Sequence, residues 1–329
     1  MAPVRPIDLG RLDALAGERG IALASDAAMG PLTTLRVGGS ADRLLAVQSR
    51  AELLGALRLA RDAGCPCFVL GNGSDLVVAD AGMRGLVIRN RSRAVAADGL
   101  HLEADAGAPM ALLVRTSIAA GLAGLEFGTS IPGTLGGAVW ANAGAHGSEM
   151  RDVVATVEAW DPRDDSSSTL DGDACAFGYR DSRFKHAPEV VLSASLVLAA
   201  DAPPAIAARV AANQAQRVAT QPLADQNAGS VFRNPPGDHA GRLIDVAGLK
   251  GLRVGGASVS ERHANFIVTD RGARAADVRA LGDRVRAEIL ARFGIGLEYE
   301  IEFVGEWPAT DEGAPADSAE AADAAGGAS

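Results

Sequence analysis

Residues 124–147 read GLEFGTSIPGTLGGAVWANAGAHG, and the rest of the chain is best interpreted from this stretch outward. Its glycines are Gly124, Gly128, Gly133, Gly136, Gly137, Gly144 and Gly147. Such a density argues against a regular helix or strand, because each glycine costs backbone entropy and offers no side chain to pack. It allows backbone N–H groups to approach a bulky anionic group closely, especially where a loop enters a helix. Tight turns in an alanine-rich protein are the other interpretation, and the stretch alone leaves both open.

Composition describes an ordinary globular protein. The chain has 329 residues, 48% hydrophobic and 22% charged, enough for two or three domains. A formal net charge of −10 argues against broad nucleic-acid binding. Three cysteines, Cys65, Cys67 and Cys175, fit neither a disulfide framework nor a zinc site, so no metal is expected. Without a basic and apolar leader or a membrane-length apolar run, the expected location is the cytoplasm.

A βαβ unit is predicted near the N-terminus. An apolar strand at 44–47 is followed by Ser49 and Glu52 at capping-box spacing, and helical periodicity then continues to Gly64. A second strand, 67–70, leads directly into the loop GNGSD at 71–75. Phosphates are often bound at such a place, although the loop is neither a P-loop nor a G-x-G-x-x-G turn before a helix.

Further elements follow from local signals. Helices are expected at 109–121, 202–219 and 275–293, and strands at 86–88, 153–160 and 190–198. The polar run 161–169 is expected to be a surface turn. At 297–303 the residues alternate, with Leu297, Tyr299, Ile301 and Phe303 on one face of a strand and Glu298, Glu300 and Glu302 on the other.

Eight ordered blocks resemble one family of flavoproteins, the UDP-N-acetylenolpyruvoylglucosamine reductases of peptidoglycan precursor synthesis. The blocks are Thr34–Gly39, Gly71–Leu76, Gly124–Gly147, Tyr179–Phe184, Gly229–Pro235, Leu249–Gly256, His263–Val268 and Leu297–Gly305. They occur in the order typical of the family and cover roughly 32–307. The only tyrosines are Tyr179 and Tyr299, so the chain resembles the shorter type of the family, which lacks a tyrosine loop over the substrate.

The resemblance implies an α+β fold: a vanillyl-alcohol-oxidase/PCMH-type FAD-binding fold of two α+β subdomains, plus a C-terminal α+β substrate-binding domain. We expect an N-terminal extension at 1–30, FAD-binding subdomains at 31–90 and 91–212, the C-terminal domain at 213–307, and a disordered acidic tail at 308–329. The implied enzyme is a monomeric FAD-dependent oxidoreductase that binds no nucleic acid or membrane. It uses NADPH as co-substrate to reduce UDP-N-acetylglucosamine enolpyruvate to UDP-N-acetylmuramate.

The resemblance also assigns three catalytic residues. Arg180 would stabilise the charge that develops at the substrate carboxylate, Ser230 would donate a proton to the neighbouring carbon, and Glu300 would hold the polar network together. From the residues alone, Arg180 could equally be a surface ion-pair residue and Ser230 a turn or cap residue. Periodicity does not separate Glu300 from the glutamates at 298 and 302.

The remaining site residues are also carried over from the family. Those expected to bind FAD are Arg36, Gly71, Asn72, Gly73, Ser74, Asp75, Leu76, Thr129, Ile131, Pro132, Gly133, Gly136, Gly137 and Asn142. Those expected to bind the substrate are Arg233, Asn234, Lys250 and His263. Asp75 departs from the family, which commonly has asparagine there, and a carboxylate near the FAD pyrophosphate would be repelled unless it faces away or meets a donor.

Two other functions remain open at this stage. The chain could be another FAD-dependent oxidoreductase of the same superfamily. More remotely, it could be a serine hydrolase that uses Ser230 with His239 or His263 as the base, although no G-x-S-x-G nucleophile elbow is present.

Overall fold

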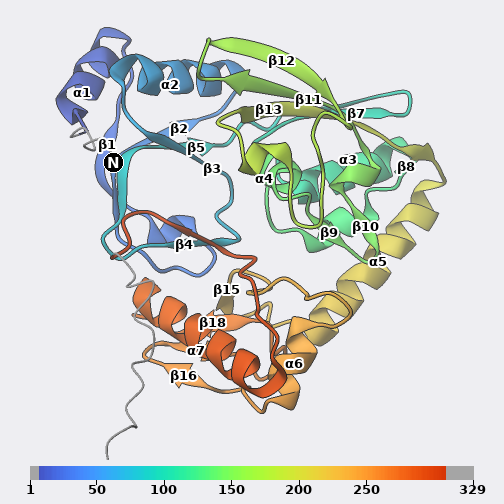
Figure 1. The fold of residues 1–329 in the computed structure, drawn as a ribbon. Helices are drawn as coiled ribbons and strands as arrows, with labels where there is room; N and C mark the ends of the chain where they lie inside the picture. Colours follow the sequence, from blue (N-terminus) through green and yellow to red (C-terminus); the bar gives the residue numbers. More distant parts are fainter. Residues whose placement is uncertain (1–6, 309–329) are drawn as a thin grey trace, which may run out of the picture.

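The computed structural model describes residues 7–308, which form two sheet-containing subdomains and a C-terminal domain (Figure 1). Beyond Pro308, the predicted acidic tail lies outside the described residues. In Figure 1 the first subdomain is blue, the second is mainly green, and the C-terminal domain is orange. The α+β class expected from the sequence is confirmed by this arrangement.

The first subdomain contains the predicted βαβ unit. Its sheet has the order β1 (Ala24–Ala28), β2 (Ser40–Val47), β5 (Met83–Asn90), β3 (Cys67–Leu70). Strands β2, β5 and β3 are parallel, whereas β1 is antiparallel to β2. Helix α2 (Arg50–Ala63) connects β2 to β3. It begins where the Ser49 side chain accepts the N–H of Glu52 and ends at Gly64, whose φ of 64° suits glycine.

The segment expected to be an N-terminal extension belongs to this subdomain instead. Strand β1 forms one edge of its sheet, and α1 (Leu9–Glu18) packs on α2. Leu12 and Ala16 of α1 are buried in the same core as Leu53 and Leu57 of α2. The amphipathic pattern of α1 was too short to reveal this packing, because a ten-residue helix gains its stability from tertiary contacts.

The second subdomain has a five-stranded antiparallel sheet covered by helices. The strand order is β12 (Ser166–Asp171), β11 (Val154–Asp161), β13 (Val190–Val197), β7 (His101–Asp105), β6 (Val95–Asp98). The helices are α3 (Met110–Ala120), α4 (Leu135–Trp140) and α5 (Pro203–Thr220). The prediction of a turn throughout 161–169 is wrong, because Ser166–Thr169 pair with β11. An edge strand with exposed side chains needs no apolar alternation, so its polar sequence gave no strand signal.

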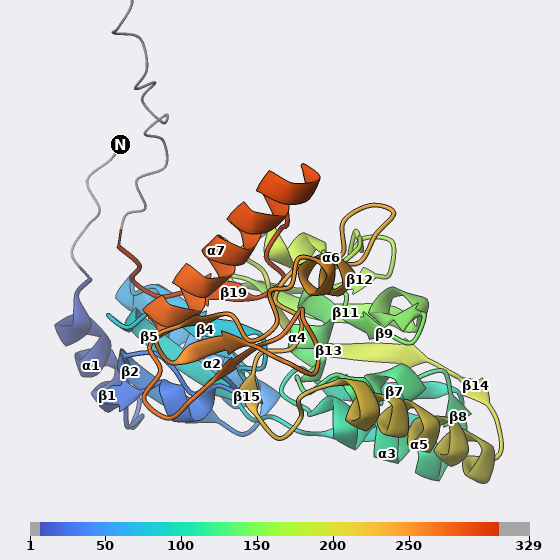
Figure 2. The same ribbon diagram turned by 90° about the horizontal axis from the view of Figure 1, so that it is seen from below.

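Helix α5 corrects one predicted boundary. The position expected between residues 212 and 213 falls in the middle of this continuous helix. Beyond it, Gln214 Nε2 still donates to Thr129 Oγ1 over 2.9 Å, so this half of α5 packs on the second subdomain. Figure 2 shows α5 alongside α3. We therefore place the start of the C-terminal domain after Thr220.

The C-terminal domain combines a small antiparallel sheet with two helices. The sheet has the order β15 (Gln226–Asn227), β18 (Ile267–Thr269), β17 (Ala257–Val259), β16 (Arg253–Val254). The helices are α6 (Ala240–Val246) and α7 (Ala275–Phe293), and α7 has the predicted bounds. Val278, Leu281, Val285 and Ile289 of α7 are buried, which confirms its predicted apolar face.

The alternating segment 297–303 does not form one continuous strand. Tyr299 makes an isolated bridge to Phe232 in the C-terminal domain. Only β19 (Glu302–Val304) is regular, and it pairs in parallel with β4 (Leu76–Val78) next to the glycine loop of the first subdomain. The segment therefore changes partners along its length and ties the C-terminal domain to the first subdomain.

Several short elements complete the chain. Strand pairs are formed by β8 (Leu122–Ala123) with β14 (Ala199–Ala200) and by β9 (Gly144–Ala145) with β10 (Ser148–Glu149). The 3₁₀ helices are η1 (Gly30–Leu32), η2 (Glu126–Ser130), η3 (Met150–Asp152) and η4 (Arg183–Lys185). The central glycine-rich stretch contains η2, α4 and β9. Its Gly136 and Gly137 lie in α4, so the expectation that glycines exclude a helix is wrong for this short element.

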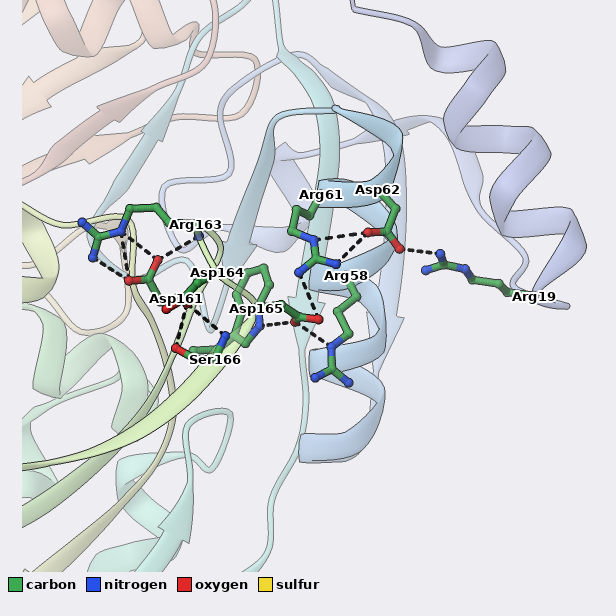
Figure 3. Close-up of polar contacts among 10 residues, drawn as sticks. Arg19, Arg58, Arg61, Asp62, Asp161, Arg163, Asp164, Asp165 and Ser166 are labelled. Carbon is green, nitrogen blue, oxygen red and sulfur yellow. Dashed lines mark hydrogen bonds and ion pairs between the residues drawn. The ribbon is translucent and has the colours of Figure 1, made fainter.

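An ion-pair network joins the first and second subdomains (Figure 3). Asp165, in the β11–β12 turn, pairs with Arg58 and Arg61 of α2 over 2.8 and 3.0 Å. The indole N–H of Trp160 donates to the same carboxylate over 2.8 Å, and its ring is buried in the core of the first subdomain. The hydrogen bonds from Arg58 and Trp160 lower the pKa of Asp165 to about 2. Above this pH the Asp165 carboxylate stays ionised and keeps its ion pairs with α2.

Candidate active site

A cavity of about 830 Å³ opens where the three parts meet. The glycine-rich stretch lines it with Ser130–Gly133 and Gly137, and the GNGSD loop contributes Ser74 and Asp75. All three predicted catalytic residues, Arg180, Ser230 and Glu300, also line this cavity. They come from the second subdomain and from two segments of the C-terminal domain, so only the tertiary fold brings them together.

Arg180 and Glu300 form the charged centre of the cavity. Arg180 Nε donates to Glu300 Oε1 over 2.7 Å, and its Nη2 donates to the carbonyl oxygen of Gly144 over 3.0 Å. About a fifth of each side chain is exposed, with values of 21% for Arg180 and 24% for Glu300. A guanidinium fixed in this way keeps its charge and still has N–H groups for a carboxylate.

The backbone around Arg180 is held in an unusual conformation. Arg180 has a φ of 54°, in the left-handed region that costs a non-glycine residue about 1–3 kcal/mol. Two hydrogen bonds to the flanking chain support it. Asn142 Nδ2 donates to the carbonyl oxygen of Gly178 over 2.7 Å, and Ser182 Oγ donates to that of Trp140 over 2.7 Å. The arginine is therefore positioned from both sides by the glycine-rich stretch.

Ser230 and Glu300 are placed by two adjacent extended segments. The N–H of Glu300 donates to the carbonyl oxygen of Val231 over 2.8 Å. The N–H of Arg233 donates to the carbonyl oxygen of Glu298 over 2.9 Å, with the Phe232–Tyr299 bridge between these bonds. This ladder fixes Glu300 beside the residue that follows Ser230, whereas the side chain of Glu298 is 77% exposed. The structure thus separates the glutamates that periodicity could not distinguish.

The glycine segments leave room for a large planar cofactor. Asn72 Nδ2 donates to the carbonyl oxygen of Pro132 over 2.8 Å and joins the two loops. A Cβ added at Gly71 would lie 2.6 Å from Thr134 Oγ1, so these loops pack as closely as glycine allows. On the other side of Gly137 is a second, mainly apolar cavity of about 560 Å³, whose walls include Phe68, Trp140 and Trp160.

Gly137 lines both cavities, so they meet at this residue. A Cβ added there would have only Thr134 Oγ1 within 4 Å apart from its own helix backbone and chain neighbours, at 3.8 Å. One cavity is polar and leads to the charged centre, and the other is apolar. A dinucleotide with an aromatic base at one end and a reactive ring at the other, such as FAD, fits this pair of cavities.

Comparisons with known proteins agree with this geometry. Residues 41–166 match the FAD binding domain family, and residues 221–304 match the UDP-N-acetylenolpyruvoylglucosamine reductase C-terminal domain. The UDP-N-acetylenolpyruvoylglucosamine reductase of Moorella thermoacetica is 47% identical over 83% of this chain and 90% of its own length. The chain belongs to the UDP-N-acetylenolpyruvoylglucosamine reductase family. It is therefore an FAD-dependent oxidoreductase.

Two further members of the UDP-N-acetylenolpyruvoylglucosamine reductase family are similar over most of their length. UDP-N-acetylenolpyruvoylglucosamine reductase 2 of Symbiobacterium thermophilum is 44% identical over 84% of this chain and 90% of its own. The crystal structure of the reductase from Thermus caldophilus is similar with a TM-score of 0.74 and 38% identity, over 87% of this chain and all of that chain. No helix among residues 7–308 is long and apolar enough to cross a membrane.

The residues predicted to bind FAD in this member of the reductase family divide into three groups. Ser74, Asp75, Ile131, Pro132, Gly133 and Gly137 line the polar cavity. Gly71, Leu76, Gly136 and again Gly137 line the apolar cavity. Arg36, Asn72, Gly73, Thr129 and Asn142 line neither.

The third group supports the loops instead of lining the cavities. The carbonyl oxygen of Gly73 accepts the N–H of Thr34, and Thr129 accepts the Gln214 amide. Asn142 is buried, and its side-chain amide donates to the carbonyl oxygen of Gly178 and accepts the N–H of Arg151, so we propose that it also positions these loops. The exposed Arg36 has a φ of 56° in the turn beside Thr34.

Two of the four residues predicted to bind the substrate line the polar cavity. Asn234 and His263 line the polar cavity, but Arg233 and Lys250 do not. Arg233 is turned toward the carbonyl oxygen of Arg180, and Lys250 pairs with Asp245 over 2.8 Å. Burial, helped by the positive charge of Lys250, lowers the pKa of His263, which is therefore neutral at neutral pH.

Sequence reasoning missed two cations that do line the cavity, Arg217 and Lys185. Arg217, on the last turn of α5, donates to the Gln221 side chain over 3.0 Å, and no carboxylate within residues 7–308 forms an ion pair with it. Burial without such a partner lowers its pKa. Lys185 pairs with Glu302 over 2.9 Å and lies over the Trp140 ring. The only sequence signal for Lys185 is its place in the polar run YRDSRFKH at 179–186, next to the family block Tyr179–Phe184.

Proposed function

We propose that this protein uses NADPH to reduce UDP-N-acetylglucosamine enolpyruvate to UDP-N-acetylmuramate, with Arg180, Ser230 and Glu300 acting on the enolpyruvyl group. The observation that carries this proposal is that three residues from distant segments line one cavity, next to the two glycine loops. Bound FAD supplies the hydride carrier between NADPH and the substrate. The apolar cavity fits the adenine end of the cofactor, and the polar cavity fits its reactive end together with the substrate.

Each catalytic residue has a role that suits its chemistry. The Arg180 guanidinium binds the substrate carboxylate and stabilises the enolate-like charge that develops there. Ser230 Oγ gives its proton to the carbon next to that carboxylate. A serine is a weak acid in water, but the carbanion that it meets is strongly basic. Positioned proton transfer of this kind contributes ~10²–10⁴ in rate. Glu300 holds Arg180 in place and polarises its surroundings.

The test is NADPH oxidation that depends on the enolpyruvyl sugar nucleotide. Glu300→Gln is expected to lower kcat by ~10² or more, because Arg180 loses its ionised partner and the network that orients it. Glu298→Gln is the matched control, since that side chain lies on the same segment but is mostly exposed. NADPH oxidation that does not require the substrate, or equal activity of the two variants, would contradict the proposal.

Arg217 is proposed to bind an anionic group of the substrate, since it is a half-buried cation that lines the cavity with no acidic partner among the described residues. Arg217→Gln is expected to raise the KM for the substrate ~10-fold or more with kcat close to wild type, because a hydrogen bond to a charged group contributes roughly 1.5–3 kcal/mol.

Lys250→Gln is the comparison for Arg217→Gln. Lys250 was the residue expected from the sequence, but it pairs with Asp245 outside the cavity lining, so its loss should change the KM less than about threefold. Steady-state kinetics with varied substrate measure both effects. If only Lys250→Gln raises the KM, the anion is bound by Lys250 and the proposal for Arg217 is wrong.

A hydrolytic site has little support. Of the two candidate bases, His263 lines the cavity with Ser230, while His239 does not. The Nδ1 of His263 accepts the N–H of Asn265 over 3.3 Å. The serine hydrolase function would be favoured only if the protein without flavin cleaved an ester.

A further inference from the structure

Three carboxylates and two cations meet at the rim of the GNGSD loop. Asp75, Arg180, Lys185 and Glu300 line the polar cavity, and Glu302 lines the apolar cavity next to it. The two cations are already engaged, because Arg180 pairs with Glu300 over 2.7 Å and Lys185 pairs with Glu302 over 2.9 Å. Within residues 7–308, Asp75 is therefore the carboxylate of this cluster without an ion-pair partner.

The position of Asp75 is fixed by its backbone. Its carbonyl oxygen accepts the N–H of Glu302 over 2.8 Å, where β19 begins to pair with β4. The preceding Ser74 lies in the same wall, and Gly133 approaches it, with an added Cβ at 3.5 Å from Ser74 Oγ. The backbone of Asp75 is thus held in the wall formed by the two glycine loops, and the residue lines the polar cavity.

The surroundings of Asp75 favour its neutral form. Glu302 on β19 and Glu300 just before it are negative, and Lys185 on η4 is the opposing cation. The facing segment 131–137 has no titratable side chain. Burial, with Glu302 next in importance and Lys185 opposing, raises the pKa of Asp75 from the usual value to about 6. FAD carries a negatively charged pyrophosphate, and its binding also removes water from this wall, so both effects favour protonation further.

We propose that Asp75 is protonated in the FAD-bound protein and donates a hydrogen bond to an acceptor atom of the cofactor, so that FAD binding takes up one proton. This inference deepens the proposed function, since it concerns the cofactor of the same site. It also explains how a carboxyl group at position 75 avoids repulsion by the FAD pyrophosphate. When protonated, this group offers a hydrogen-bond donor, as an asparagine amide would.

The sign of the pH dependence follows from linkage. Below about pH 6 the carboxyl of the FAD-free protein already holds the proton, and FAD binding needs no uptake. Above that pH the proton must be taken from solution, so FAD binds more weakly as the pH rises. The dissociation constant is expected to increase about tenfold per pH unit until the pKa of the FAD-bound form is reached.

The experiment is dilution of the FAD-loaded, full-length protein at about pH 5.5 to 8.5, with free flavin measured by fluorescence. Wild type is expected to show the tenfold rise per pH unit above about pH 6. Asp75→Asn is expected to bind FAD with little pH dependence over this range and to bind more tightly than wild type at about pH 8. Asp225→Asn, at an exposed carboxylate that also lines the cavity, is the matched control and should retain the wild-type slope.

A second variant tests the cluster without changing Asp75. Glu302→Gln removes the largest repulsive charge and frees Lys185, so the pH at which FAD binding begins to weaken should move lower. A flat wild-type profile, or an unchanged slope in Asp75→Asn, would overturn the inference while leaving the reductase function intact. Failure of wild type to bind FAD at any pH would instead contradict the proposed function.

Discussion

Gly137→Val is expected to yield protein that retains no FAD after purification. Gly137 lines both cavities, and a side chain there would extend into the space that we propose for the cofactor. Forcing methyl groups into a filled space costs about 1–3 kcal/mol, and displaced cofactor contacts on both sides add to this. Affinity should therefore fall by roughly 100-fold or more.

The measurement for Gly137→Val is the ratio of flavin to protein absorbance after gel filtration. Gly137 lies inside α4 and has no positive φ, so valine does not require a forbidden backbone conformation, and the effect should come from blocked space. Gly55→Val is the control, because Gly55 is also in a helix and an added Cβ there meets nothing within 4 Å. Normal flavin content in Gly137→Val would mean that this glycine does not face the cofactor.

Ser230→Ala is expected to separate the two halves of the reaction. In the proposed reaction Ser230 Oγ only supplies a proton to the substrate. Flavin binding and the loss of flavin absorbance on adding NADPH should therefore stay close to wild type. Recovery of that absorbance on adding the enolpyruvyl substrate should slow by at least ~10², the lower end expected for removing a positioned acid. Stopped-flow absorbance of the flavin band follows each half separately.

Ser230→Cys should recover part of this loss, since a thiol can also donate a proton, though with a different size and geometry. Ser258→Ala, in β17 of the same domain, is the control for a general effect of serine removal. Should Ser230→Ala slow the NADPH step as much as the substrate step, Ser230 positions the cofactor or supports the fold, and its role as proton donor is wrong.

Much of the fold could be predicted because its signals are local. Helices α2, α3 and α7 begin and end where caps, proline and glycine indicated, since these residues satisfy or release the terminal backbone groups of their own helix. The prediction of one continuous strand at 297–303 was wrong, because strand pairing depends on residues far apart in the chain. Alternation reports which side chains are buried, but only the tertiary structure decides which partner each part of the segment pairs with.

The sequence indicated some residues of the cavity but did not show which residues line it. Family blocks placed Arg180, Ser230 and Glu300 on three segments, and the structure brings all three to one cavity. The blocks gave no means to distinguish residues that line the cavity from residues that hold its walls. Asn142 and Gly73 belong to the walls, because their polar groups are used by the protein itself.

The sequence by itself determined the glycine loops and the main helices, because these depend on residues close together in the chain. Its family motifs supplied the proposed catalytic residues. The tertiary structure alone decided which charges are compensated. Among residues 7–308, Lys250 and Arg180 pair with carboxylates, whereas Arg217 has no acidic partner and Asp75 has no basic partner. Charge compensation depends on distances between segments far apart in sequence, because electrostatic energy falls with distance in space and not along the chain.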